Sequence, residues 1–148
     1  METWPMTEAR QMLPSLVESA RSGAWQRVGR RGRPEAVIAG ASDLDELLAP
    51  VYCFHIEVVL GDGSVGLWLP ALETHAAGAT LDDALAELAD VMVDYAEDWQ
   101  DHLRLAANHR PRAGFVRRIQ IAGDTAGVLA MLQRDAATER SSEVTDGP

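Results

Sequence analysis

The sequence is poor in the residues from which small proteins build cross-links and metal sites. It has one cysteine, Cys53, which excludes an internal disulfide and a metal site made of several cysteines. Aromatic residues make up only 5% of the 148 residues, so a core must rest on aliphatic side chains. No apolar run is long enough to span a bilayer, and the first residues lack the charged and apolar regions of a signal peptide. We therefore expect a cytoplasmic protein that has no contact with a membrane.

Lysine is missing altogether, and all 13 basic residues are arginine. The formal net charge is −10, but the charge is unevenly distributed. Residues 1–40 carry six arginines against four glutamates, whereas residues 51–108 carry one arginine against 11 acidic residues. An acidic total usually argues against binding of nucleic acid, so the basic N-terminal segment is the informative part.

The first 50 residues predict a small αβ unit. Thr7 is a plausible helix N-cap, and Pro14 is expected to break this region into two short helices that end near Arg21. Their predicted buried face consists of Leu13, Leu16, Val17 and Ala20. Runs at 25–29 and 34–39 flank a basic loop containing glycine, which is typical of a β-hairpin, and a short helix should follow at 42–48. A unit of this size is expected to need a partner subunit for stability.

Residues 51–135 predict a second domain of order β-β-β-α-β. Strands are expected at 51–60 and 65–69 around a Gly-Asp-Gly-Ser turn, with a third near 73–76. Thr80 opens the clearest helix, whose apolar stripe is Leu81, Leu85, Leu88, Met92, Tyr95 and Trp99. Phe115–Ala122 is predicted to form the last strand, and Asp124 to cap a final helix. The polar, aperiodic residues 136–148 are expected to be a disordered tail.

The N-terminal unit resembles the prevent-host-death (Phd/YefM) antitoxin family. The resemblance rests on the segment 7–13, the pair Leu16-Val17, the hairpin 28–38 and the short helix 44–48, in the same order and spacing. It implies a homodimer that binds operator DNA through basic residues of the first helix and the hairpin. The matching residues are Arg10 and Arg30, and their neighbours Arg31 and Arg33 are candidate DNA-binding residues with them. Arginine suits this role because its guanidinium can form paired hydrogen bonds with a guanine edge or a phosphate.

The second half resembles the HicB-type antitoxin domain. The matching segments are Gly61-Asp62-Gly63, then Leu69-Pro70-Ala71-Leu72, then 78–84, which leads into the helix. The resemblance implies a domain that binds and masks a small toxin. The fold class expected for the whole chain is therefore α+β, a Phd/YefM-like domain at 1–50 followed by a HicB-like domain.

The acidic helix offers a candidate surface for a basic toxin. Asp90, Asp94 and Glu97 lie off its apolar stripe, where they form either a solvated face or a docking surface that attracts a positively charged partner. The toxin could be RelE-like, Doc-like or HicA-like.

No catalytic constellation, metal site or cofactor is expected. His55 and Glu57, two residues apart on a predicted strand, could form half of an acid–base or metal site, but such a pair is more often an ordinary surface pair. The sequence predicts an antitoxin that neutralises a toxin and represses its own operon. A stand-alone transcriptional regulator with a ligand-binding second domain is the alternative, and a small enzyme using His55 and Glu57 is a third possibility.

Overall fold

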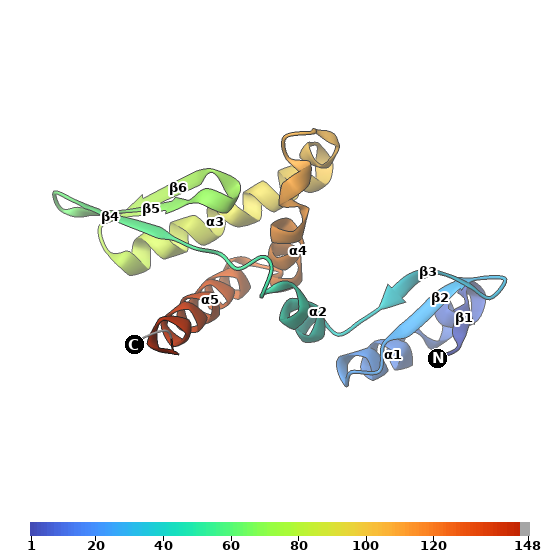
Figure 1. The fold of residues 1–148 in the computed structure, drawn as a ribbon. Coiled ribbons are helices and arrows are strands. Elements are labelled where there is room, and N and C mark those ends of the chain that lie inside the picture. Colours follow the sequence, from blue (N-terminus) through green and yellow to red (C-terminus); the bar gives the residue numbers. More distant parts are fainter. Residues whose placement is uncertain (146–148) are drawn as a thin grey trace. The chain divides into compact units, whose positions relative to one another are not determined.

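The computed structural model describes residues 1–145, and within them the chain is an α+β protein with two three-stranded sheets and five α-helices. The chain divides into two compact units, Met1–Leu47 and Leu48–Pro148 (Figure 1), which we call unit 1 and unit 2. None of the helices in the described part of the chain is both long and apolar enough to cross a membrane. The roles predicted for the two domains remain predictions.

Unit 1 places one long helix on a small sheet. Its elements are β1 (Thr3–Pro5), α1 (Met6–Arg21), β2 (Gln26–Arg30), β3 (Arg33–Ile38) and α2 (Ala41–Leu48), which ends at the start of unit 2. The strand order is β1-β2-β3, with β1 parallel and β3 antiparallel to β2. Pro5 is tolerated because β1 lies at the edge of the sheet. The predicted hairpin and short helix are confirmed.

The prediction of two short helices broken at Pro14 is wrong, because α1 runs through this residue. Leu16 and Ala20, four residues apart on one face of α1, are both buried, and this burial outweighs the backbone hydrogen bond that Pro14 cannot donate. The predicted buried face is correct for these two residues only. Leu13 and Val17 remain 48% and 41% exposed.

Unit 2 begins with an antiparallel meander. It consists of β4 (Glu57–Gly61), β5 (Ser64–Leu69), the 3-10 turn η1 (Pro70–Leu72) and β6 (Thr74–Gly78), in the order β4-β5-β6. The Gly61–Ser64 hairpin and the third strand are confirmed. The first strand is shorter than predicted, because residues 51–56 form an irregular segment before β4.

Helix α3 (Leu81–Asp101) forms the second layer of unit 2 and lies along β6 and β5 (Figure 1). Thr80 caps it as predicted, since its hydroxyl accepts a hydrogen bond of 3.1 Å from the backbone N–H of Asp83. The apolar stripe is buried at Leu88, Met92 and Trp99, whereas Leu81 at the first turn is exposed.

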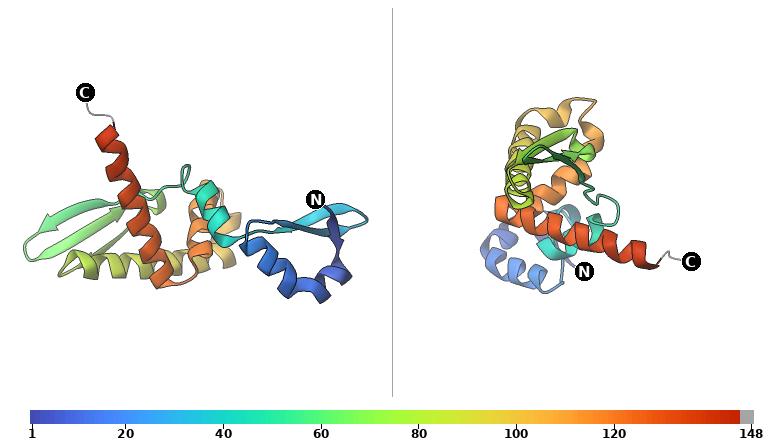
Figure 2. Two further views of the ribbon diagram at one scale, coloured as in Figure 1. Left: turned by 90° about the horizontal axis from the view of Figure 1, so that it is seen from below. Right: turned by 90° about the vertical axis from the view of Figure 1, so that its left-hand side faces the viewer.

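The chain after α3 is helical, which corrects the prediction of a final strand. Two 3-10 turns, η2 (Leu103–Leu105) and η3 (Arg110–Arg112), lead into α4 (Ala113–Ala122) and α5 (Thr125–Thr145). Segment 115–122 is helical because Val116 and Ile119, three residues apart, are both buried in the core. Helix α5 packs against α3 and crosses it (Figure 2).

The predicted disordered tail is also corrected where the structure describes it. Residues 136–145 continue helix α5. Ser141 and Ser142 donate hydrogen bonds to the carbonyls four residues before them, which is compatible with an exposed helix. Residues 146–148 lie outside the described residues.

Candidate functional site

The tip of the β2–β3 hairpin holds an arginine in an unfavourable backbone conformation. The turn consists of Arg31 and Gly32, whose φ angles of 51° and 74° are both positive, as in a type I′ turn. Glycine adopts this conformation freely, whereas a residue with a Cβ does so at a cost of about 1 kcal/mol. The turn therefore keeps a guanidinium at a position that Gly or Asn would fill more easily.

Two further arginines lie opposite each other beside this turn. Arg30 and Arg33 are the last paired residues of the two strands. Like charges in this position destabilise a hairpin. Glu35 compensates only in part, because its carboxylate lies 3.6 Å from the Arg30 Nε in an exposed pair that contributes little to stability. Positive charge is thus concentrated at the hairpin tip, although it lowers the stability of the hairpin. Such a loss of local stability is typical of a functional site.

Arg10 lies at the same end of unit 1. Pro5 pairs with Gly29, beside the hairpin tip, and α1 begins directly after Pro5. Arg10 is therefore about 6 Å along the helix axis from its start, exposed next to the buried Ala9. The structure thus brings Arg10 to the end of the sheet that carries Arg30, Arg31 and Arg33.

Gly29 makes this turn possible. The register of β2 and β3 shifts between Val28 and Gly29, which marks a β-bulge. Gly29 is buried so closely against the hairpin that a Cβ there would overlap the carbonyl oxygen of Arg33. The strand can therefore bend toward the tip only with glycine at this position.

Arg27 of β2 is a further arginine of this sheet, and no sequence motif marks it as a site residue. Its Nε is buried and makes no hydrogen bond within residues 1–145. Arg27 pairs with Thr3 and Val37, whereas the neighbouring Val28 belongs to the core between sheet and α1. Strand alternation therefore puts Arg27 on the sheet face away from α1. A buried donor normally has a partner, so this unpaired Nε is an unusual feature of that face.

The three predicted acidic residues lie along α3 at steps of four and three, and all are exposed. Asp90 has a local role, since it accepts a hydrogen bond of 2.7 Å from the hydroxyl of Thr125, the first residue of α5. Asp94 and Glu97 continue the exposed face. Glu97 also borders an open hollow of about 370 Å³, whose lining includes the side chains of Val93 and Gln120.

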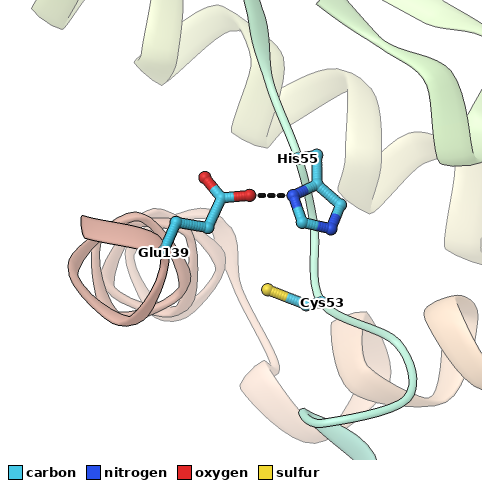
Figure 3. A group of neighbouring side chains, drawn as sticks. All are labelled: Cys53, His55 and Glu139. Atoms are coloured by element: carbon cyan, nitrogen blue, oxygen red, sulfur yellow. Dashed lines mark ion pairs between the residues drawn. The ribbon is translucent and has the colours of Figure 1, made fainter. Parts of the chain in front are cut away.

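A second group of polar side chains lies in unit 2, where the irregular segment before β4 meets α5. Cys53, His55 and Glu139 point toward one another there (Figure 3), and their ligand-type atoms all lie within 4.8 Å of each other. His55 forms an ion pair with Glu139. Burial, followed by the nearby Asp135 carboxylate, raises the pKa of the Cys53 thiol. The two-residue spacing of Cys53 and His55 was the only signal in the sequence, because Glu139 lies far along the chain.

A buried ion pair holds this segment in place. Arg118 of α4 and Asp135 of α5 are 1% and 4% exposed and form two hydrogen bonds of 2.6 and 3.1 Å. Asp135 also accepts a hydrogen bond of 2.8 Å from the backbone N–H of Phe54. Arg118 donates one of 3.2 Å to the carbonyl of Tyr52. The backbone on both sides of Cys53 is therefore fixed to the two helices.

Comparisons with known proteins give a family match and a structural neighbour. The sequence model of the PHD-like family, described as "Antitoxin of toxin-antitoxin, RelE / RelB, TA system", matches residues 1–134. Among solved structures, the antitoxin part of a proposed toxin/antitoxin system from Syntrophomonas wolfei subsp. wolfei is similar, with a TM-score of 0.65 and 16% sequence identity. The match covers 88% of this chain and 96% of that chain. At this identity the likeness concerns the fold alone. No curated protein matches the sequence.

Proposed function

The chain belongs to the PHD-like family of toxin–antitoxin antitoxins, and from this premise we propose that it neutralises a toxin through unit 2 and binds operator DNA as a homodimer through unit 1. In this proposal the protein acts by binding and not by catalysis, and it represses its own operon. The RelE / RelB description of the family favours a RelE-like toxin among the three kinds considered from the sequence.

The observation that carries the DNA-binding proposal is the hairpin tip. Arg31 sits at a positive φ, and Arg30 faces Arg33 across the strands. Both features lower the stability of the free hairpin, and both place guanidinium groups on a narrow, exposed projection. Such a projection suits contact with phosphates or with base edges in a groove, where the positive charges are compensated by the nucleic acid.

A second copy of unit 1 is the proposed partner in the dimer. The core of unit 1 is small, consisting of the buried Ala9, Leu16 and Val28 with Trp4 and Ile38 packed against them. Helix α1 nevertheless leaves apolar side chains exposed, among them Met12, Leu13 and Val17. Burying these side chains between two copies would enlarge the core and would present two arginine tips to one duplex. Sedimentation of the intact chain over a range of concentrations measures this association.

The proposed toxin surface rests on charge. Residues 48–148 carry 16 acidic residues against seven arginines, and Asp94 and Glu97 are exposed on α3. A toxin that acts on RNA has a positively charged binding surface, which an acidic helix face attracts and can cover.

The experiment that tests DNA binding uses a duplex covering the promoter upstream of the protein's own gene. Arg31→Asn is the main variant, because Asn tolerates the positive φ, so that the hairpin should fold at least as well while losing one charge per chain. We expect weaker binding and a plot of log K against log salt whose slope is smaller by about two for the dimer.

Arg21→Gln is the matched control, since Arg21 is an exposed arginine in the last turn of α1 that pairs with Glu18. It should bind the duplex with nearly the affinity of the unmodified protein. Equal affinities for Arg31→Asn, Arg21→Gln and the unmodified protein at every salt concentration would show that the hairpin does not contact DNA.

A further inference from the structure

Unit 2 contains three metal-ligating side chains of different chemistry that belong to two separate segments. Cys53 and His55 come from the irregular segment before β4, and Glu139 comes from α5 (Figure 3). A thiolate, an imidazole and a carboxylate are the three side-chain ligands that Zn²⁺ accepts in proteins. Mixed sets of this kind exclude Ca²⁺ and Mg²⁺, which take oxygen ligands.

We propose that Cys53, His55 and Glu139 bind one divalent transition-metal cation of the zinc class, which fastens the C-terminal part of α5 to the segment that leads into β4. This site is additional to the toxin- and DNA-binding functions proposed above and does not depend on them.

The distances are close to those of a tetrahedral site. Ligand atoms bound to one Zn²⁺ at about 2.0–2.3 Å lie about 3.4–3.6 Å apart at tetrahedral angles. The three ligand atoms here lie within 4.8 Å of one another, and in this proposal small side-chain rotations bring them to the tetrahedral spacing. The side chains of His55 and Glu139 are 68% and 38% exposed, which leaves a path for the ion and room for a water molecule as fourth ligand.

The backbone that carries these ligands is already ordered by the neighbouring buried pair. Asp135 accepts a hydrogen bond from the backbone N–H of Phe54, the residue between Cys53 and His55. Asp135 and Glu139 are four residues apart on α5 and therefore lie on the same face of the helix. The face of α5 that binds the segment before β4 through Asp135 therefore also presents Glu139 to that segment. Such support by surrounding hydrogen bonds is characteristic of metal sites.

The charge balance also favours a cation. On binding, the Cys53 thiol releases its proton to solvent and its sulfur lone pair forms the bond to the metal, while His55 binds through a neutral ring nitrogen. A thiolate and the Glu139 carboxylate then offset the two positive charges of the ion.

The test uses the intact protein after treatment with a chelator. Titration with Zn²⁺ in a calorimeter should give one site per chain. Titration with Co²⁺ should produce a thiolate-to-cobalt charge-transfer band in the near ultraviolet, which reports on the sulfur ligand directly. Cys53→Ser should remove this band, and Cys53→Ser, His55→Gln and Glu139→Gln should each weaken Zn²⁺ binding at least tenfold.

Two control variants change the same residue types elsewhere in unit 2. Glu143→Gln alters an exposed carboxylate one turn further along α5, and His75→Gln alters an exposed histidine of β6. Both should bind Zn²⁺ like the unmodified protein. Hydrogen exchange of peptides covering 136–143 should slow when Zn²⁺ is added, and this effect should be absent in Glu139→Gln. Zn²⁺ affinities that are the same in the three ligand variants and the two controls, or a cobalt complex without the charge-transfer band, would overturn the proposal.

Discussion

Replacing Arg118 by methionine probes how unit 2 is held together. The guanidinium is 1% exposed and forms hydrogen bonds of 2.6 and 3.1 Å with Asp135, itself 4% exposed. Methionine fills a similar volume without charge. In Arg118→Met the Asp135 carboxylate stays buried and keeps the hydrogen bond from Phe54 N–H, but its counterion is gone. Removing one partner of a buried ion pair costs about 3–5 kcal/mol of unfolding free energy.

This loss is large for a domain of this size. Domains with about 100 residues have unfolding free energies of about 5–15 kcal/mol, so the variant should lose about a fifth or more of its stability. With a urea m-value of about 2 kcal/mol/M, the midpoint of unfolding should fall by about 1.5–2.5 M. Urea titration followed by far-ultraviolet circular dichroism measures this, because α3, α4 and α5 of unit 2 supply most of the helical signal.

The double variant Arg118→Met/Asp135→Leu separates the charge effect from packing. Both charges are then absent, and the remaining cost comes from the Tyr52 carbonyl and the Phe54 N–H, which lose these partners at about 1–3 kcal/mol each. The double variant should therefore be destabilised by less than the sum of the two single variants. The reasoning is refuted if Arg118→Met alone shifts the unfolding free energy by less than 1 kcal/mol, or if the two single effects simply add.

Two further changes test the other surfaces. Gly29→Ala should destabilise unit 1 by about 1–3 kcal/mol, because its methyl group would overlap the Arg33 carbonyl, and a thermal melt that matches the unmodified protein would contradict the packing described for the bulge. Asp94→Asn combined with Glu97→Gln should weaken binding of the co-purified toxin more at 50 mM than at 500 mM salt, as surface plasmon resonance would show. If the loss of affinity is the same at both salt concentrations, the acidic face does not attract the toxin.

The sequence predicted the elements whose signals are local. The unit 1 hairpin, the β4–β5 hairpin and the capped helix α3 each have a turn or capping residue next to a periodic apolar pattern. These patterns depend only on neighbouring residues, so they could be read without knowing the rest of the fold.

Segment 115–122 shows why the other elements could not be predicted. Its β-branched and aromatic residues favour a strand, and Arg118 fits a solvent-facing position on one. In the folded chain Arg118 is buried, because Asp135 from a different helix neutralises it. A partner that lies 17 residues away in sequence leaves no local signal, and tertiary packing outweighs strand propensity here.

The Cys53–His55–Glu139 group could not be predicted either, because it also depends on tertiary packing. Neither segment carries a recognisable ligand motif, and only the packing of α5 beside the segment before β4 brings the three side chains together. The sequence placed His55 and Glu57 on one strand, but β4 begins at Glu57, so His55 is not part of the strand.

The crowding of positive charge at the unit 1 hairpin also means that added electrolyte should act on this region in two opposite directions. Mobile anions weaken the repulsion between Arg30 and Arg33, so the hairpin of the uncomplexed protein should become more rigid as ionic strength rises. The same ions compete with any polyanion for these side chains and lower its affinity. A hairpin that is loosest when free at low ionic strength is therefore also the one that gains most order when a polyanion binds.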